Sequence, residues 1–428
     1  MILAVNTSFP EINHLAAELA DADLLSKYVR PYASLQRPWE RFLAQLPGVG
    51  SFYNRSFGRR KLPEPLSAEH INEAGVAIDF LMAAHALLPA SIPGYQSVRR
   101  KMLDRRTHIV GLQAARVLKD EDAVVASWGC ADRVFRAAKE RGALCILNYP
   151  LAHHRFARRY LNEEAELQPA FASTLNTHDR PDWYIQVLDE EIELADHILV
   201  GSSFARDSFI AEGIPGEKLT VLPYGADVHL FQPAETPKPP SDNLKLLFVG
   251  QIGQRKGISY LLDAVRRMDR KGDTLTLVGQ FQGDGVAFEN SQPLFHHIPH
   301  VPHTVLREIY RQADVFVFPT LVEGLGIVVL EAMASGLPVI TTPNGPGDIV
   351  RDGVDGYLVP PRDVNAIIDR LERLRADPDL RAEMGRNARQ RAQEYTWDAY
   401  RQAGLSAIKE WSNLSRTNMA VPGYTDGG

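Results

Sequence analysis

The sequence is poor in cysteine, in net charge and in uninterrupted apolar runs. Two cysteines, Cys130 and Cys145, occur among 428 residues. Two are too few for a disulfide framework or for a zinc site made of cysteine alone. Both stand in apolar stretches, so we expect buried free thiols in a reducing compartment. The formal net charge of −6 excludes a global basic field of the kind that attracts nucleic acid.

The sequence also gives no clear membrane span or secretory leader. The best candidate for a span, residues 75–92, is interrupted by Asp79, His85 and Pro89. A charge at bilayer depth costs about 3 kcal/mol on insertion scales, so we interpret this segment as a core helix. Residues 1–5 are apolar but short and lack a basic leader. We therefore expect no secretory signal and a cytoplasmic protein.

What the chain does contain is a repeated alternation of short β-rich runs and helical patterns. Strands are expected at 2–6, 123–127, 143–149, 197–200, 219–222, 244–249, 274–278, 314–318 and 338–341. Helices are expected at 12–22, 131–141, 178–193, 203–212, 257–268, 304–312, 327–335 and 364–376. This order predicts parallel strands with helical crossovers, and hence a doubly wound α/β domain in each half.

A proline-rich stretch separates the two halves. Residues 232–241 contain four prolines, which fix φ and lack an N–H donor, so this stretch continues neither a helix nor a central strand. The predicted organisation is an N-terminal domain at 1–231, a linker at 232–243, a C-terminal domain at 244–395 and a disordered tail at 413–428. A C-terminal helix at about 396–412 is expected to pack back onto the N-terminal domain.

The first motif that suggests chemistry lies at 250–257, directly after a predicted strand. Its glycines, including Gly253, allow a tight turn and let an anion approach the backbone. Arg255 and Lys256 stand at the start of the next helix, where the helix dipole disfavours cations unless an anion lies beside them. The motif therefore predicts a site for an anion such as a diphosphate. The alternative is a turn whose long side chains extend into water.

The second motif, at 319–333, also follows a predicted strand. Gly324 and Gly326 open a helix with no Ser, Thr, Asp or Asn immediately ahead, which leaves its first N–H groups free for the oxygens of a ligand. Glu323 in the loop and Glu331 two turns into the helix are acceptors for the hydroxyl groups of a sugar and a ribose. The alternative is a surface Glu323 and a Glu331 paired with a base, which the apolar residues around Glu331 disfavour.

Three weaker signals accompany these motifs. Residues 341–348 are typical mainly of turns, although the first turn could form a wall of the donor pocket. His153 and His154 follow a strand, and a catalytic histidine and a structural one are both open interpretations. The pairs at 21–23 and 377–379 have an Asp-x-Asp spacing, but neither follows a predicted strand, so we predict no metal site.

Residues 27–61 are interpreted as irregular, basic and aromatic, with Glu40 as the only acid. The basic residues are Lys27, Arg30, Arg37, Arg41, Arg55, Arg59, Arg60 and Lys61, and the aromatic ones considered are Trp39, Phe42, Phe52, Tyr53 and Phe57. A second basic cluster comprises Arg99, Arg100, Lys101, Arg105 and Arg106. Two interpretations stay open: contact with an anionic membrane surface, and a loop that packs its aromatic rings inward.

With these residues in view, the second half resembles the retaining glycosyltransferases of family four, also called glycosyl transferases group 1. Two glutamates with seven residues between them, after a strand, are the hallmark of that family, and Glu323 and Glu331 match it. The run 323–340 is a close match. Arg255-Lys256-Gly257 resembles the diphosphate clamp of the family, and 223–227 with Phe231 resembles the segment before its interdomain linker. The resemblance implies a GT-B fold, in which two Rossmann-like doubly wound domains face each other across a cleft.

The resemblance also implies roles for these residues. Arg255 and Lys256 would neutralise the leaving diphosphate, and Glu331 would hold the ribose. The donor sugar and phosphate would be held by the loop residue Gly253, by Glu323 and by the backbone amides of Gly324, Leu325, Gly326 and Ile327. The family's cleft histidine maps loosely onto His153 or His154. Family members transfer with retention of configuration, usually without a metal, so we expect no cofactor beyond the nucleotide-sugar co-substrate.

The function that follows is transfer of a hexose from a nucleotide-diphosphate sugar to a saccharide or lipid-linked acceptor, in polysaccharide or glycolipid biosynthesis. Expected partners are the donor, the acceptor and a peripheral contact of 27–61 with the inner face of the membrane, and not nucleic acid. The chain departs from the family at 6–13, which lacks the usual glycines, and at Asp348, where a glutamate is common. Alternatives are a sugar phosphorylase, a nucleotide-sugar epimerase and a non-catalytic nucleotide-sugar sensor.

Overall fold

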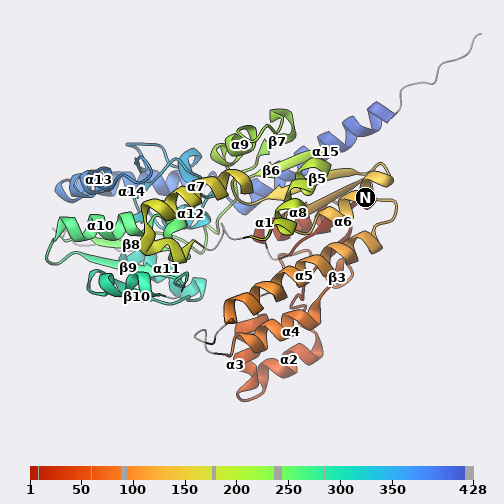
Figure 1. Ribbon diagram of the computed structural model, residues 1–428, viewed down its shortest axis with the longest axis horizontal. Coiled ribbons are helices and arrows are strands. Elements are labelled where there is room, and N and C mark those ends of the chain that lie inside the picture. Colours follow the sequence, from red (N-terminus) through yellow and green to blue (C-terminus); the bar gives the residue numbers. More distant parts are fainter. Residues whose placement is uncertain are drawn as a thin grey trace, which may run out of the picture. The chain divides into compact units, whose positions relative to one another are not determined.

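The protein forms two compact units, seen in the computed structural model of Figure 1. The structure describes residues 1–7, 9–58, 60–88, 92, 94–175, 180–235, 243–283 and 285–419. The first unit contains Met1–Tyr149, Asp182–Leu199 and the chain from Arg401 onward, and the second contains Pro150–Pro181 and Val200–Tyr400. The predicted domain bounds stay a prediction, and most of the predicted linker lies outside the described residues.

The first sheet has seven strands in the order β3-β2-β1-β4-β5-β6-β7. Its strands are β1 (Ile2–Val5), β2 (Leu25–Arg30), β3 (Ile71–Glu73), β4 (Ala123–Ser127), β5 (Leu144–Tyr149), β6 (His197–Val200) and β7 (Leu219–Val221). β1 pairs in parallel with β2 on one side and with β4 on the other. Every residue of β1, β4 and β5 is buried, which explains why the sequence of these strands is a continuous apolar run rather than an alternating pattern.

The second sheet has six strands in the order β10-β9-β8-β11-β12-β13. They are β8 (Lys245–Val249), β9 (Thr274–Val278), β10 (His296–Ile298), β11 (Val315–Phe318), β12 (Val339–Thr341) and β13 (Gly356–Leu358), and all are parallel. In both sheets the first strand lies in the middle and the order reverses beside it, as in a Rossmann fold. The prediction of two doubly wound α/β domains is confirmed.

Most of the crossover helices also follow the predicted pattern, but the helix at His154–Leu167 was not predicted. In the first unit they include α1 (Pro10–Asp21), α6 (Asp132–Glu140) and α8 (Asp182–Leu194). In the second they are α7 (His154–Leu167), α9 (Ser203–Ile210), α10 (Ile258–Met268), α11 (His303–Gln312), α12 (Ile327–Ala334), α13 (Val364–Ala376) and α14 (Pro378–Ala392). Asp377 caps α14 by accepting a hydrogen bond from the amide of Leu380 at 2.9 Å, so this Asp-x-Asp pair includes a helix cap.

The C-terminal helix is longer than predicted. α15 runs from Trp397 to Met419, so the first seven residues of the predicted disordered tail, 413–419, are helical, and the rest of the tail lies outside the described residues. The ring of Trp411 stacks on that of His197 in β6, with 4.1 Å between their centroids. The helix therefore has an apolar anchor in the first unit, which supports order near the end of the chain.

The prediction that residues 27–61 are irregular was wrong. They contain most of β2, then α2 (Pro38–Gln45), α3 (Val49–Tyr53) and a π-helical turn, η1 (Asn54–Gly58). Pro38 occupies the first turn of α2, and the Glu40 carboxylate returns to accept from the Arg37 amide at 3.1 Å. This is the glutamate half of a capping box; the guanidinium of Arg37 has no acceptor atom and cannot supply the other half.

Two more helices complete this part of the first unit. The segment predicted as a core helix, 75–92, contains a shorter helix, α4 (Val76–His85), which is not a core helix because only Asp79, Ala83 and His85 in it are buried; α5 (Tyr95–Val117) follows it. We call α2, α3, η1 and α4 the helical insert; Figure 1 shows its labelled helices side by side. Its core contains Tyr32, Tyr53, Phe57 and Ala83. Among the described residues, no helix is long and apolar enough to cross a membrane.

Candidate functional site

The two strongest sequence motifs meet at the point where the second sheet reverses its order. β8 pairs with β9 on one side and with β11 on the other. The loop after β8 carries Arg255 and Lys256, and the loop after β11 carries Glu323 and Gly324. In open parallel sheets, ligands bind outside the carboxyl ends of the strands at such a reversal. The topology therefore brings together two motifs that are well separated in the sequence.

The loop after β8 is fixed by the buried side chain of Gln254. Its Nε2 donates to Glu164 at 2.6 Å and to the Ser259 hydroxyl at 2.7 Å, while its Oε1 accepts from the Ser259 amide at 3.1 Å. Gly257 has a φ of +68°, and a Cβ there would lie 2.0 Å from the carbonyl oxygen of Pro319. Only glycine tolerates both this positive φ and this close approach, so the loop after β8 and the loop after β11 pack backbone to backbone. This packing fixes the position of Arg255 and Lys256, which lie between Gln254 and Gly257.

Arg255, Lys256 and Glu323 converge. Nη1 of Arg255 lies 3.3 Å from Oε2 of Glu323 and donates to the carbonyl of Val322 at 2.9 Å. The ammonium of Lys256 pairs with the same carboxylate oxygen and lies 5.1 Å from the centre of the Phe318 ring. The two cations therefore share one carboxylate, so this cluster of three has an excess of one positive charge.

Burial makes this excess charge costly. Burial lowers the pKa of Arg255 to about 10, and burial together with the charge of Arg255 lowers the pKa of Lys256 well below its usual value. The Glu323 carboxylate opposes these effects, but it is shared between both cations. A dianionic group placed here would stabilise both charged forms, so the electrostatics favour an anionic ligand.

The first turn of α12 supplies free amides beside this cluster. Gly326 is the N-cap residue with a φ of +85°, and no side chain caps the helix. The Gly324 amide donates to Oε1 of Glu323 at 3.2 Å. A Cβ on Gly324 would lie 2.0 Å from the carbonyl oxygen of Pro150, and one on Gly345 would lie 2.6 Å from Cβ of Glu323. The glycines thus allow the loops from 150, 324 and 345 to close around Glu323.

A pocket of about 460 Å³ lies at the carboxyl ends of β8 and β9 and contains Glu331. Its other lining residues include Gly250, Gly279, Gln280, His300, His303 and Val328. The hydroxyl of Tyr310 donates to Oε2 of Glu331 at 2.9 Å, which fixes the carboxylate. Burial raises the pKa of Glu331 to about 7, against this hydrogen bond. A buried carboxylate in a pocket of this size suits the hydroxyls of a ribose.

The pocket contains residues that the sequence analysis missed, among them Gln280, His300 and His303. Gln280 follows β9, whose exit carries Gly279 with a φ of +141°, where a Cβ would lie 1.8 Å from the carbonyl oxygen of Gly250. Gly279, a glycine directly after a strand, was therefore the feature of the sequence that could have predicted this part of the pocket. His300 and His303 stand between β10 and the first turn of α11, and β10 was not predicted because its three residues include two histidines.

The two candidate histidines have different surroundings in the second unit. His153 is the N-cap of α7: its Nδ1 accepts from the Arg155 amide at 3.2 Å, and its ring packs edge-on against Phe209 at 4.8 Å. His154 stacks on His153 at 4.4 Å. These contacts give His153 a structural role and leave His154 as the candidate for chemistry.

The turn at 341–348 is mainly structural, with one part at the site. Asn344 donates to the carbonyl of Leu321 at 2.8 Å, and Gly345 packs against Glu323. Asp348 accepts from the Ser203 amide at 2.5 Å and so satisfies the start of α9. The residue that departs from the family pattern thus has a capping role, which an aspartate performs well.

Comparison with known proteins shows which proteins the chain is similar to. Residues 243–377 match the sequence model of the family described as Glycosyl transferases group 1. The match covers about a third of the chain and includes both sequence motifs, at 250–257 and 319–333. It is 25% identical over 387 residues to the D-inositol 3-phosphate glycosyltransferase of Kribbella flavida, covering 80% of this chain and 88% of that one. Relatives of the same name are more similar over shorter stretches, for example 30% over 253 residues, or 56% of the protein, in Corynebacterium kroppenstedtii.

Solved structures agree with the fold. The sucrose-phosphate synthase of Thermosynechococcus elongatus superposes with a TM-score of 0.64 over 97% of this chain and 100% of the other, at 19% identity. Anabaena HepE in complex with UDP-glucose gives a TM-score of 0.60 over 96% and 99%, at 14% identity. The chain has the GT-B fold, as the sequence predicted, and is a sugar-transferring enzyme.

Proposed function

We propose that this glycosyltransferase takes a hexose from a nucleotide-diphosphate sugar held in the second unit and transfers it with retention of configuration. The observation that carries the proposal is the convergence of Arg255, Lys256 and Glu323 beside the uncapped start of α12. In this proposal the diphosphate lies against the two cations and the amides of Gly324–Ile327. Gly253 belongs to the loop that surrounds the diphosphate. The nucleoside occupies the pocket that contains Glu331.

The bond that breaks joins the anomeric carbon of the donor sugar to the leaving phosphate oxygen. Negative charge grows on that oxygen, and fixed cations stabilise it more in the transition state than in the ground state. The acceptor hydroxyl forms the new bond to the anomeric carbon, and its proton passes to the departing diphosphate. Glu323 is engaged with two cations, so it acts by positioning the clamp and the donor sugar rather than as a nucleophile.

The acceptor is assigned to the first unit, at the reversal of its own sheet. The loop after β1 meets the loop after β4 there, where the Thr7 amide donates to the Ser127 hydroxyl at 3.2 Å. Trp128 is half-buried and packs on Tyr149 with 4.8 Å between ring centroids. An aromatic face is a suitable platform for a saccharide. The names of the relatives include an inositol phosphate and a sucrose-phosphate, so the acceptors tested include phosphorylated polyols as well as lipid-linked sugars.

We also propose that the reaction takes place in the cytoplasm. Cys130 and Cys145 are both free and buried, and burial raises the pKa of the Cys145 thiol to about 12 and that of Cys130 further. Neutral, enclosed thiols are compatible with a reducing compartment. Metal ions are proposed to be dispensable because the cations of the protein face the diphosphate, and chelator treatment that abolished turnover would contradict this.

The donor is tested by a thermal-shift screen against uridine, guanosine and adenosine diphosphate sugars. A ligand at 100 times its Kd stabilises a protein by about 2.7 kcal/mol, and uridine is the first base to test because HepE was solved with UDP-glucose. The donor that is found is then incubated with candidate acceptors, with and without inorganic phosphate. Sugar transfer to the acceptor without phosphate supports the proposal, whereas a sugar phosphate formed only with phosphate would show a phosphorylase.

A further inference from the structure

The helical insert divides its aromatic residues into two groups. Tyr53 and Phe57 are buried, and Tyr32 packs with them. Trp39 and Phe42 on α2 are instead 41% and 62% exposed. The interpretation that the rings pack inward therefore holds for Tyr53 and Phe57 but not for Trp39 and Phe42, and contact with a membrane stays a prediction.

The exposed rings belong to a larger apolar surface. Of the sixteen large apolar side chains that are exposed in the described part of the chain, nine lie between residues 39 and 98. They are Trp39, Phe42, Val49, Phe80, Leu81, Leu87, Leu88, Ile92 and Val98. Trp39 and Phe80 both pack against the ring of Tyr32, at 6.2 and 5.9 Å, so exposed rings of α2 and α4 lie close together around one buried ring. Such clustering indicates an interaction surface.

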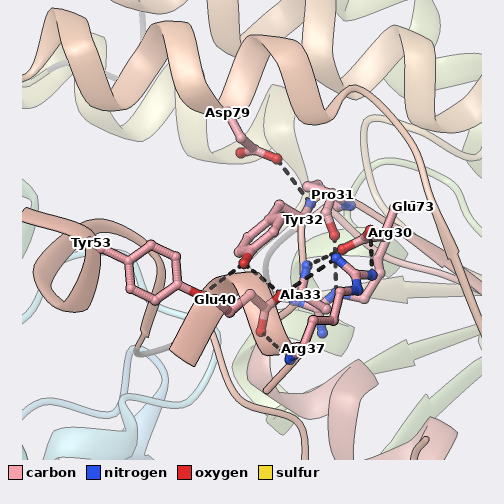
Figure 2. Close-up of polar contacts among 9 residues, drawn as sticks. All are labelled: Arg30, Pro31, Tyr32, Ala33, Arg37, Glu40, Tyr53, Glu73 and Asp79. Carbon is pink, nitrogen blue, oxygen red and sulfur yellow. Dashed lines mark hydrogen bonds and ion pairs between the residues drawn. The ribbon is translucent and has the colours of Figure 1, made fainter. Parts of the chain in front are cut away.

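Two stretches of this region are poor in acids, and the exposed Glu64 and Glu69 lie in the segment between them. Residues 38–61 contain a single acid, Glu40, and residues 80–103 contain none. Glu40 is 1% exposed, and its carboxylate accepts from the Tyr32 hydroxyl at 2.8 Å and from the Arg37 amide at 3.1 Å (Figure 2). The only acid in the first range is thus withdrawn into the core. Arg41, Lys61 and the cations at 99–101 all stand in these two acid-poor ranges.

A pocket of about 370 Å³ opens in the insert. Its lining includes the buried groups Glu40 and Tyr53, whose hydroxyl lies 2.9 Å from that of Tyr32. Its exposed lining residues include the cations Arg41 and Lys61 and the amides Gln45 and Asn54. Cations and amides around a polar interior suit a ligand that combines a negative charge with hydroxyl groups. A phospholipid headgroup such as phosphoglycerol has this chemistry.

We propose that the helical insert docks on the surface of an anionic lipid bilayer, with one phosphate-containing headgroup in the pocket between Arg41 and Lys61 and with Trp39 and Phe42 among the acyl chains. The combination of exposed apolar groups with the cations of the two acid-poor ranges is complementary to such a bilayer. A second copy of the chain fits less well, because a symmetric contact would place one surface with Arg41 and Lys61 against another surface with the same cations.

Arg60 has a different role from its neighbour Lys61. It pairs with Asp79 at 2.7 Å and lies 5.3 Å from the centre of the Phe57 ring, and Arg106 also pairs with Asp79, at 3.1 Å. Asp79 is fully buried and accepts from the Tyr32 amide at 2.9 Å. Removal of Arg60 would therefore disturb the fold of the insert, and Arg59 lies outside the described residues, so neither is suitable for testing the surface.

The test is flotation of the full-length protein with vesicles of phosphatidylcholine alone and with about one-third phosphatidylglycerol. We expect binding only to the anionic vesicles, and loss of binding at high salt. A cation near such a surface contributes about fivefold to the binding constant, so R41E/K61E is expected to weaken binding at least about 25-fold. The matched control K271E/R386E reverses two exposed cations of the second unit and is expected to bind like the wild type.

A second pair of variants tests the apolar contribution. W39S/F42S is expected to weaken vesicle binding, while W183S, which removes another exposed tryptophan, is not. Quenching of tryptophan fluorescence by brominated lipid is expected in the wild type and reduced in W39F, which keeps an apolar ring. Circular dichroism and thermal unfolding of each variant establish that the insert still folds.

Three results would overturn the proposal. The first is equal binding to neutral and anionic vesicles, and the second is equal loss with the control pair. The third is tight binding of free glycerol 3-phosphate, blocked by R41E/K61E, without any vesicle binding; this would make the pocket a site for a soluble phosphorylated ligand. Donor binding in the thermal-shift screen is measured on the same variants and is expected to be unchanged, so failure here is distinguishable from failure of the proposed function.

Discussion

The variant Lys256→Met separates the diphosphate clamp from the rest of the donor site. The change keeps an apolar chain of similar length against Phe318 and removes the ammonium that pairs with Glu323. A charge-assisted hydrogen bond contributes about 1.5–3 kcal/mol, which corresponds to about 10- to 150-fold in Kd. We expect that loss for a nucleoside diphosphate and almost none for the nucleoside, whose pocket contains Glu331 rather than Lys256.

Turnover should fall further than affinity, because charge grows on the leaving diphosphate in the transition state. Removing one preorganised donor from such a site lowers kcat by about 100- to 1,000-fold. The fold should survive, because Glu323 keeps Arg255 at 3.3 Å and the Gly324 amide at 3.2 Å. The variant is therefore expected to lose less stability than the roughly 3–5 kcal/mol typical of a buried charge left without any partner.

The measurements are calorimetric titrations of the diphosphate, monophosphate and nucleoside of the base found in the screen, followed by kinetics with the sugar donor. Lys271→Met, at an exposed lysine of the same unit, is the control and should behave as the wild type. If Lys256→Met weakened the nucleoside as much as the diphosphate, or left turnover intact, the assignment of this lysine to the leaving group would be refuted.

Three further predictions concern the same site. Since burial lowers the pKa of Lys256 below its ordinary 10.5, diphosphate affinity should fall as pH rises through that lowered pKa, and titrations in Lys256→Met should not show this fall. Glu331 has a pKa raised from 4.5 to about 7, so protonation of this group favours the native state most below pH 4.5, and that contribution is lost as pH rises to about 7. Above about pH 7, Glu331→Gln should consequently raise the Tm, and the free energy of unfolding should increase by at most about 3 kcal/mol. The same change should weaken nucleoside binding. An unchanged Tm would contradict the burial argument. Gly324→Ala places a Cβ 2.0 Å from the carbonyl oxygen of Pro150, so it should lower the free energy of unfolding by about 1–3 kcal/mol and reduce activity. In the control Gly347→Ala the nearest atom is 3.5 Å from the new Cβ. Denaturant unfolding of this control should show almost no change.

The sequence determined the architecture of the second unit and the identity of its motifs. Strands such as β9 and helices such as α13 were predicted with the observed bounds, because buried parallel strands are apolar runs and the helices between them have clear starts. The two motifs each follow a strand, so their position at one edge of a parallel sheet follows from the order of the elements alone. Short elements escaped prediction: β10 contains two histidines in three residues, and only pairing with β9 makes it a strand.

Tertiary structure alone decided which side chains form ion pairs with each other and which are exposed to solvent. That Glu323 accepts both cations, and that Glu331 is fixed by Tyr310, depends on packing between elements distant in sequence. Residues 27–61 show the same limit. Their composition indicated a basic and aromatic surface, but not the helices of the insert or the burial of Glu40 and Phe57. Composition states which groups are available, whereas burial is a property of the folded chain, because it depends on neighbours that only folding brings together.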